Sequence, residues 1–306
     1  MISFLKLIRY KNLLMVLLTL VLTKYALINA FTSAISGLQF VLVAMAILCI
    51  TAAGYIINDI YDVAADSINK PTKVFIGNTI SKKNGVLAYF TLTTIGLTFG
   101  VYAAFIKEYI SFSIFFIIAI VLLYWYSKSL KRIAIVGNIA ISFLTALTIF
   151  MVFIFEARNI QSSSNIIEVI VHLFTSISVT IAIFLYIIFA FFMTLIREII
   201  KDIEDINGDY ASKMKTLPII IGINRTKKIV LFISSLMFLF ILIILKEELI
   251  HLPLLFWYTI LFIISPFAWF LYKLVSSKTT KDFHFLSTLI KGIMFFGIVS
   301  MLLIKR

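Results

Sequence analysis

The chain has 306 residues, of which 62% are hydrophobic and 13% charged, and its formal net charge is +13. Too few polar residues are present to cover a water-soluble globule, and the basic residues are scattered among short segments rather than clustered as in nucleic-acid-binding proteins. The single cysteine, Cys49, excludes an internal disulfide and a cysteine-based metal site. The composition therefore predicts a polytopic membrane protein.

Nine apolar segments are long enough to span a bilayer, which takes about 20 helical residues. In chain order they cover approximately residues 13–33, 38–57, 86–106, 109–126, 134–155, 171–195, 228–246, 253–273 and 284–303. No long polar linker divides them. We therefore expect an all-α integral membrane protein in which residues 1–306 form one domain of nine transmembrane helices.

Lysine and arginine are distributed unequally between the two sides of this predicted topology. One side carries most of them, in the N-terminal residues and in segments 58–85, 127–133, 196–227 and 274–283. The other side has only Lys24, Lys107, Arg158, Lys246, Lys305 and Arg306. Because basic loops stay in the cytoplasm, we expect a multi-pass protein of the cell (inner) membrane with the first set of loops cytoplasmic. Lys24, inside the first span, is expected to extend its amino group to the outer interface.

An acidic pattern follows the second apolar segment. Asp59, Asp62 and Asp66 are spaced i, i+3 and i+7, and Asn58 stands one turn before Asp62. On a helix these positions share one face. Three carboxylates on one face repel each other, so the arrangement is costly without a cation.

The same spacing returns about 140 residues later, after the sixth apolar segment. Asp202, Asp205 and Asp209 repeat it, and Glu198 extends the predicted stripe. Six of the fourteen acidic residues thus belong to two matched clusters, both on the predicted cytoplasmic side. Carboxylate oxygens are the ligands of Mg²⁺, which fills the rest of its shell with water and phosphate. We therefore predict Mg²⁺ bound through both clusters and a polyanionic ligand; two solvated acidic loops are the alternative.

Basic residues surround these acids. Lys70, Lys73, Lys128, Lys131, Arg132, Arg197 and Lys201 all fall near the same helix ends. A metal together with lysine and arginine suits a diphosphate leaving group, whose oxygens gain charge as its bond breaks. For any single lysine, the positive-inside bias is an equally good explanation.

The motifs resemble those of a known family. Asn58-Asp59-x-x-Asp62-x-x-x-Asp66 with Asn69-Lys70-Pro71 is similar to the first signature of the UbiA superfamily of intramembrane prenyltransferases, and Lys201-Asp202-x-x-Asp205-x-x-x-Asp209 to the second. The segment Tyr126–Arg132, with Gly137-Asn138, resembles the loop between the fourth and fifth helices of that family. The resemblance spans essentially the whole chain. It implies a funnel-like bundle around a central cavity, capped by both motifs at the cytoplasmic face.

One branch of the family is more similar than the rest. Arg197–Asp209, with Lys215–Ile219 and Gly222, resembles the enzymes that make digeranylgeranylglyceryl phosphate. Arg197 stands where many members with aromatic acceptors carry a tyrosine. An arginine suits an acceptor that bears a phosphate, and binding of the diphosphate is the alternative role for this residue. Lys73 departs from the family pattern, which often has arginine there; it keeps the charge but loses the bidentate fork.

The resemblance implies transfer of an isoprenyl group, geranylgeranyl in that branch, from its diphosphate to geranylgeranylglyceryl phosphate. Catalysis would rest on Asp62, Asp202, Lys201 and Arg197, metal binding on the six aspartates, and substrate binding on Asn58, Lys70, Lys73, Lys128, Lys131, Arg132 and Asn138. The expected partners are the diphosphate, a lipophilic acceptor and the bilayer, with no nucleic acid and no obligatory protein partner. A quinone precursor such as 1,4-dihydroxy-2-naphthoate or 4-hydroxybenzoate is the alternative acceptor.

Two other classes fit the sequence less well. A transporter would place its charged residues near the bilayer midplane rather than at helix ends on one side. A CDP-alcohol phosphatidyltransferase would need Asp-Gly-x-x-Ala-Arg after its first aspartates, and Asp62-Val63-Ala64-Ala65-Asp66 lacks it.

Overall fold

The computed structural model describes residues 2–28, 35–156, 177–247 and 249–304. Within these ranges the chain forms helices joined by short turns, with two isolated backbone bridges and no strand. Nine helical stretches there are long and apolar enough to cross a membrane, which confirms the predicted all-α class with nine spans. The end of the predicted first span (29–33) and the start of the sixth (171–176) lie outside the described residues.

The described chain divides into two units. The first comprises residues 1–130 and 146–187, and the second comprises residues 131–145 and 188–306. Helices α6 (Val136–Glu156) and α8 (Ile177–Glu204) each contribute one part to either unit. The single domain expected from the sequence stays a prediction.

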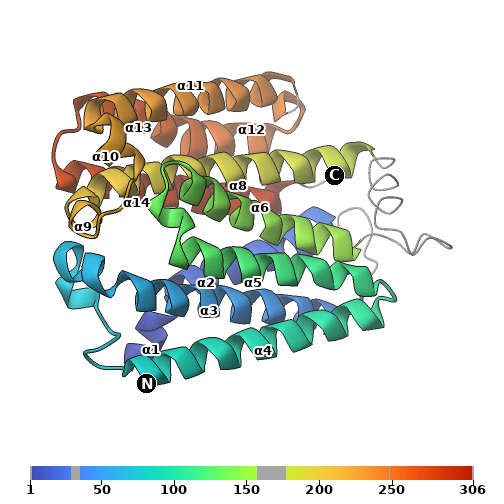
Figure 1. Ribbon diagram of the computed structural model, residues 1–306. Coiled ribbons are helices and arrows are strands. Elements are labelled where there is room, and N and C mark those ends of the chain that lie inside the picture. Colours follow the sequence, from blue (N-terminus) through green and yellow to red (C-terminus); the bar gives the residue numbers. More distant parts are fainter. Residues whose placement is uncertain (1, 29–34, 157–176, 248, 305–306) are drawn as a thin grey trace. The chain divides into compact units, whose positions relative to one another are not determined.

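The first unit is built around α3 (Gly37–Asn69), which lies beside α4 (Lys82–Ile106) and α5 (Ser113–Lys128) (Figure 1). Its other helices are α1 (Ile2–Leu7) and α2 (Tyr10–Leu22), which continues as a π-helical turn over Thr23–Ile28. Glycines on α4 allow the close packing: a Cβ at Gly96 would lie 3.1 Å from the carbonyl oxygen of Ala46 on α3, and one at Gly100 would lie 2.6 Å from the Phe116 ring. Small residues at such contacts are typical of membrane helices.

Helix α3 is longer than the apolar segment that predicts it. The capping box of Ser36 and Gln39 fixes its first turn. It then runs beyond residue 57 to Asn69, where the Lys70 amide donates to the Asp66 carbonyl at 2.8 Å and Pro71 follows. Because a proline disfavours helical geometry in the residue before it, the helix ends there. The polar motif from Asn58 to Asp66 is therefore part of the same rigid helix as the membrane span.

Lys24 does not reach the outer interface, so that prediction is wrong. Its side chain is 2% exposed, and its Nζ donates to Glu156 Oε1 at 2.5 Å and to the Ile35 carbonyl at 3.1 Å. Glu156, at the end of α6, is itself 1% exposed. The buried carboxylate is a counter-ion for the ammonium group inside the protein. The lysine therefore does not need to extend to the water at the interface. Burial lowers the pKa of the neighbouring Lys107, and the negative charge of Glu156 counteracts this.

Lys24→Met should destabilise the protein strongly, because it leaves a buried carboxylate without its closest cation. Removing one partner of a buried pair costs about 3–5 kcal/mol, whereas replacing both with apolar residues is often neutral. The double variant Lys24→Met/Glu156→Leu should therefore recover most of the loss of thermal stability in detergent. Lys246→Met is the matched control, since the Lys246–Glu247 pair is exposed and its loss should change little. Additive losses in the double variant would contradict a coupled buried pair.

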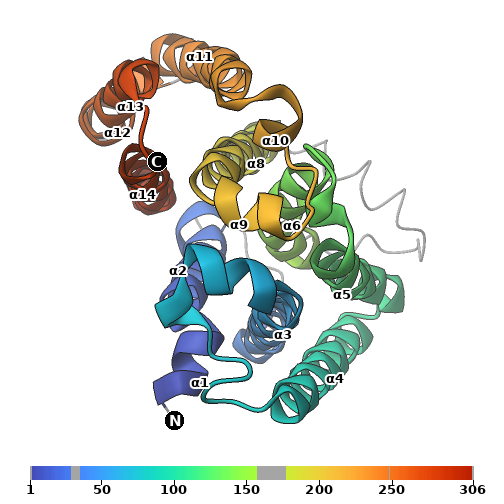
Figure 2. The same cartoon turned by 60° about the vertical axis from the view of Figure 1, so that its left-hand side comes forward.

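The second unit packs four long helical stretches around an apolar core. These are the C-terminal part of α8, α11 (Ile223–Glu247), the stretch formed by α12 (Pro253–Thr259) and α13 (Ser265–Ser276), and α14 (Thr280–Val299). A π-helical turn at Ile260–Ile264 joins α12 to α13 just before Pro266, which has no amide hydrogen to donate to an α-helical bond. The core is formed by Phe267, Phe270, Phe283 and aliphatic residues of all four stretches. Short helices α9 (Ile206–Ala211) and α10 (Leu217–Ile221) connect α8 to α11 (Figure 2).

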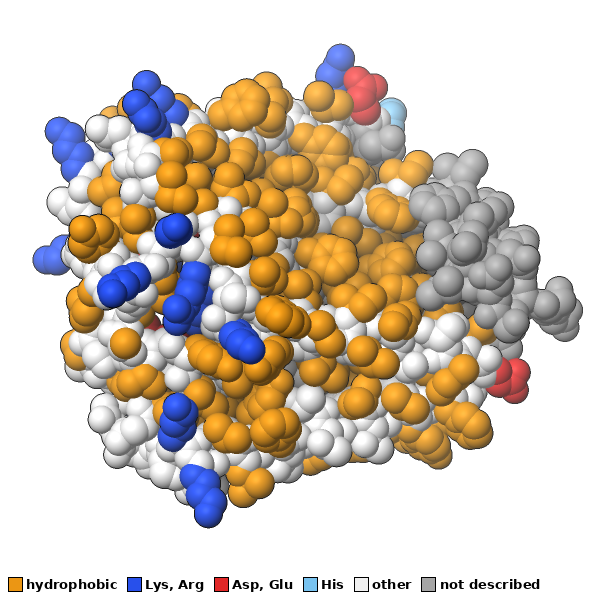
Figure 3. Space-filling model, viewed as in Figure 1, with side chains coloured by type: hydrophobic (Ala, Val, Ile, Leu, Met, Phe, Trp, Pro, Cys, Tyr) orange, Lys and Arg blue, Asp and Glu red, His pale blue; other side chains and the backbone are white. Residues whose placement is uncertain are grey.

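Much of the visible surface is apolar (Figure 3). On α4, for example, Leu87, Phe90 and Phe105 are each at least 60% exposed. Large apolar side chains exposed along long helices suit contact with lipid rather than water. This agrees with the membrane assignment from composition.

Candidate functional site

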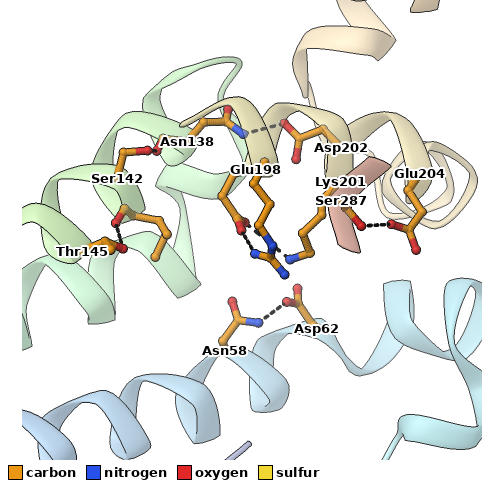
Figure 4. A network of polar contacts seen from close by, with 12 residues as sticks. Asn58, Asp62, Asn138, Ser142, Thr145, Glu198, Lys201, Asp202, Glu204 and Ser287 are labelled. Carbon is orange, nitrogen blue, oxygen red and sulfur yellow. Dashed lines mark hydrogen bonds and ion pairs between the residues drawn. The ribbon is translucent and has the colours of Figure 1, made fainter. Parts of the chain in front are cut away.

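The first acidic motif, residues Asn58–Asp66, lies on the last turns of α3 in the first unit. Asn58 Nδ2 donates to Asp62 Oδ2 at 2.7 Å, the i, i+4 contact that the helical spacing predicts (Figure 4). The amide thereby fixes one Asp62 oxygen and the orientation of its carboxylate. Asp59, Asp62 and Asp66 are all partly exposed and belong to one continuous helix, as expected.

A basic residue outside the predicted site contacts this motif. Arg9 Nη2 donates to Asp59 Oδ1 at 2.8 Å, and the guanidinium carbon lies 4.9 Å from the centre of the Tyr55 ring. Asp59 is 12% exposed. The first aspartate of the motif thus has a counter-ion supplied by the protein itself.

The second motif, residues Lys201–Asp209, lies in the second unit, where Asn138 of α6 contacts it. Asn138 Nδ2 donates to Asp202 Oδ2 at 2.8 Å, and the carbonyl of Asn138 accepts from Ser142 Oγ at 2.6 Å (Figure 4). Asn138 is 7% exposed, so its amide is held firmly. Asn138 and Asp202, both predicted as site residues, are 64 residues apart in the sequence and form a hydrogen bond in the structure. The contact is of the same kind as that between Asn58 and Asp62, with an asparagine amide donating to an aspartate oxygen.

One turn before Asp202, Glu198 pairs with two cations. Arg197 Nη1 donates to Glu198 Oε1 at 2.6 Å. Lys201 Nζ lies 3.4 Å from Glu198 Oε2 (Figure 4). The Arg197 Nε atom is buried and has no hydrogen-bond partner among the described residues. Two positive charges share one carboxylate here, and a buried donor lacks an acceptor. Such a group favours an additional anion, because an unsatisfied buried donor is costly.

The second motif does not form the single helical stripe that its spacing predicts. Helix α8 ends at Glu204, and α9 begins after Asp205, whose φ and ψ are −94° and 7°. Helical hydrogen bonds continue on both sides, from the Asp205 amide to the Lys201 carbonyl at 2.8 Å and from the Asp209 amide to the Asp205 carbonyl at 3.2 Å. Aspartate, asparagine and glycine at 205, 207 and 208 have poor helix propensity, which favours a break at this point. Asp209 consequently lies on a different helix from Asp202 and is 9% exposed.

The basic loop before α6 is tied to the loop after α9 within the second unit. Lys215 donates its amide to the Arg132 carbonyl at 2.9 Å, next to a bridge between Ile133 and Lys215. This pairing positions the backbone that carries Lys131 and Arg132. In the first unit, Lys70 caps α3.

Two other predicted basic residues belong to the first unit. The amino group of Lys128 lies 5.5 Å from the Tyr124 and Trp125 ring centres, so it already has aromatic partners. Lys73 lies in the short helix Pro71–Lys73 that follows α3.

Glu204, between Asp202 and Asp205 in the sequence, contacts a different helix, α14. One oxygen lies 2.8 Å from His284 Nδ1 on α14. The other accepts from Ser287 Oγ at 3.3 Å on the same helix (Figure 4). This acidic residue therefore anchors the end of α8 to α14.

The carboxylate and amide groups of the site suit a hard divalent cation, although the described residues form no preformed cage for one. No group of three or more His, Cys, Asp or Glu side chains in the described residues could hold a metal as they stand. Instead Asp59, Asp62 and Asp202 each have an internal partner. Mg²⁺ commonly uses one or two carboxylates and takes its other ligands from phosphate and water. The residues suit an ion that arrives with a phosphate-bearing ligand, and each asparagine amide contacts one oxygen of its aspartate.

Proteins of similar sequence match different shares of the chain. A digeranylgeranylglyceryl phosphate synthase of Saccharolobus solfataricus is 33% identical over 186 residues, and the match covers 61% of this chain and 58% of that protein. One of Metallosphaera sedula is 27% identical over 265 residues, covering 86% of this chain and 82% of that protein. The digeranylgeranylglyceryl phosphate synthase of Sulfurisphaera tokodaii is matched over 60% of its length. The chain thus spans only about three fifths of the length of this relative and of the one from Saccharolobus solfataricus.

Solved structures share the fold over nearly the whole chain. A structure of digeranylgeranylglyceryl phosphate synthase covers 98% of both chains with a TM-score of 0.64 at 22% identity. A UbiA homologue from Archaeoglobus fulgidus, bound to GPP and Mg²⁺, covers 98% of this chain and 99% of that one, with a TM-score of 0.62 at 15% identity. At such identities the likeness shows the fold alone. Residues 15–299 match the model of the UbiA prenyltransferase family, and the chain therefore belongs to that family.

Proposed function

We propose that the protein transfers an isoprenyl group from its diphosphate to a lipophilic acceptor that carries a phosphate, with geranylgeranylglyceryl phosphate as the acceptor and geranylgeranyl as the donor group. Membership of the UbiA prenyltransferase family and the similarity to digeranylgeranylglyceryl phosphate synthases support the reaction class. The observation that carries the acceptor assignment is Arg197: its buried Nε has no partner among the described residues, beside a second cation, Lys201. A phosphate would supply the missing acceptor, and a neutral phenol would not supply the charge.

The proposed reaction begins with cleavage of the bond between C1 of the prenyl chain and the diphosphate oxygen, whose electron pair leaves with pyrophosphate. Bound Mg²⁺ would stabilise the charge that develops on this leaving group. The proposed metal ligands are Asp59, Asp62, Asp66, Asp202, Asp205 and Asp209. The acceptor hydroxyl then attacks the allylic cation and loses its proton, which gives an ether, pyrophosphate and a proton.

The chain's own residues have distinct tasks in this proposal. Asn58 and Asn138 each donate to one oxygen of Asp62 and Asp202, and in this proposal they thereby hold the two carboxylates in position for the metal. Lys201, Lys131 and Arg132 neutralise the diphosphate, with Lys70, Lys73 and Lys128 as further cations on the same side. Arg197 holds the acceptor phosphate. Because the surrounding helices are apolar, water is kept from the cation.

An acceptor panel tests this proposal. Purified protein would be given geranylgeranyl diphosphate with geranylgeranylglyceryl phosphate, 1,4-dihydroxy-2-naphthoate and 4-hydroxybenzoate in competition. We expect the prenylated glycerol phosphate to be the main product. Prenylation of an aromatic compound alone would overturn the acceptor assignment while leaving the ionisation chemistry intact.

Membrane topology gives an independent prediction. In a Cys49→Ala background, cysteines at Ser81 and Ser212 should react with a membrane-impermeant label only from the cytoplasmic side, because the basic loops remain there. A cysteine at Glu247, at the far end of α11, should react only from the other side. Opposite accessibility of Ser81 and Ser212 would contradict a shared cytoplasmic face for the two motifs.

A further inference from the structure

Arg9 occupies an unusual backbone position at the junction of α1 and α2. Its φ and ψ are 52° and 53°, in the left-handed region that residues other than glycine rarely adopt. The turn is held by hydrogen bonds from the Arg9 amide to the Lys6 carbonyl at 3.0 Å and from the Asn12 amide to the Arg9 carbonyl at 2.7 Å. Such strained positions concentrate at functional sites, where they fix the direction of a side chain.

The strained turn presents the guanidinium to the first motif. Two features of α3, one turn apart, hold it: the Asp59 carboxylate at 2.8 Å and the Tyr55 ring at 4.9 Å. Arg9 is 36% exposed and Asp59 12%, so the pair is partly shielded from water. Asp59 is also one of the carboxylates proposed above as metal ligands, and Arg9 already occupies one of its oxygens.

We propose that Arg9 is a resident counter-ion that couples metal binding to diphosphate binding at the first motif. Without ligands it neutralises Asp59. A metal that arrives alone competes with the guanidinium for the negative charge of Asp59 and leaves the guanidinium less well compensated. A metal that arrives with a diphosphate brings new phosphate oxygens for the released guanidinium, which favours joint loading. This inference rests on the proposed function, because it assumes that the first motif binds a divalent cation.

Mn²⁺ binding, followed by electron paramagnetic resonance, tests the coupling without any turnover. The protein would carry Asp202→Asn in all samples, so that binding by the first motif dominates. Arg9→Gln should tighten binding of Mn²⁺ alone by about 3- to 10-fold, because a charge-assisted competitor is removed. Inorganic pyrophosphate should then strengthen Mn²⁺ binding less in Arg9→Gln than in the protein with Arg9.

Two further variants separate the guanidinium contact from general charge. Arg9→Lys keeps the positive charge and, like Arg9→Gln, places a residue other than glycine in the left-handed turn. Its Mn²⁺ affinity should therefore resemble that of the parent protein more than the affinity of Arg9→Gln does. Lys11→Gln removes an exposed positive charge two residues away and should change the Mn²⁺ affinity by less than 2-fold. Equal effects of Arg9→Gln and Lys11→Gln would overturn the proposal.

The result also distinguishes this inference from the proposed function. If Mn²⁺ binds and Asp62→Asn abolishes binding, yet Arg9→Gln leaves the affinity unchanged, the counter-ion role is wrong and the metal site stands. If Mn²⁺ does not bind even when Asp202 is restored, or binds equally well in Asp62→Asn, the first motif is no metal site and the proposed function loses its metal chemistry together with this inference.

Discussion

Asp62→Asn and Asp202→Asn should each lower the rate of prenyl transfer by at least about 100-fold while the protein still inserts and purifies normally. Each change keeps the shape of the side chain but removes the negative charge on which the proposed metal binding depends. Asn58 and Asn138 contact these two carboxylates in the same way, one on each motif. The rate is measured as the amount of prenylated product formed per unit time at saturating concentrations of both substrates. EDTA should abolish turnover in the wild type, and added Mg²⁺ should restore it.

Glu247→Gln serves as the control for loss of an acidic side chain. Glu247 is 63% exposed and lies on α11 outside both motifs, so its amide variant should retain full activity. The double variant Asp62→Asn/Asp202→Asn should be scarcely slower than either single variant if both motifs serve the same step, because residues that act as a unit are strongly non-additive. Full activity in either single variant would exclude the proposed two-motif metal chemistry.

Arg197→Tyr should raise the Michaelis constant for a glycerol-phosphate acceptor far more than that for the prenyl diphosphate. A guanidinium can make two parallel bonds to a phosphate, which a tyrosine cannot. Losing one charge-assisted contact costs roughly 1.5–3 kcal/mol, which is about 10- to 150-fold in binding. The buried Nε of Arg197, without a partner among the described residues, is the donor that this contact would satisfy. Steady-state kinetics with each substrate varied in turn would measure the two constants.

The controls separate charge, geometry and stability. Arg197→Lys keeps the charge but loses the fork, so its effect should fall between the wild type and Arg197→Tyr. Arg225→Gln removes an exposed arginine of α11 and should leave both constants unchanged. An equal rise for the two substrates in Arg197→Tyr would mean that Arg197 serves the diphosphate instead of the acceptor.

The membrane spans could be read from the sequence because long apolar runs have few alternatives in a bilayer. Where polar residues follow such a run, the pattern is less informative: the apolar segment ends near residue 57, yet α3 continues to Asn69. At the first motif the spacing correctly predicted that the helix continues, but at the second it did not predict the break at Asp205. The i, i+3, i+7 spacing is satisfied, but helix propensity falls at residues 205–208, and the second motif is divided between α8 and α9.

Ion pairs between different helices could not be predicted from spacing. Arg9 belongs to a basic stretch with Lys6 and Lys11, and only the left-handed turn selects it for Asp59. Lys24 and Glu156 are 132 residues apart, so no local sequence pattern predicts that they form an ion pair. By contrast, Asn58 and Asp62 follow from helix geometry alone. Local periodicity thus predicts contacts along one helix, whereas contacts between helices depend on packing that the sequence does not display.

The central claim is that the protein joins a prenyl group to a glycerol-phosphate acceptor with release of pyrophosphate. The most direct test incubates purified protein with geranylgeranyl diphosphate, geranylgeranylglyceryl phosphate and Mg²⁺, and quantifies both products by mass spectrometry and a pyrophosphate assay. The account predicts one ether-linked product for each pyrophosphate released, and neither product in EDTA. Pyrophosphate release without the ether, or no consumption of geranylgeranylglyceryl phosphate while an aromatic acceptor is prenylated, would contradict it.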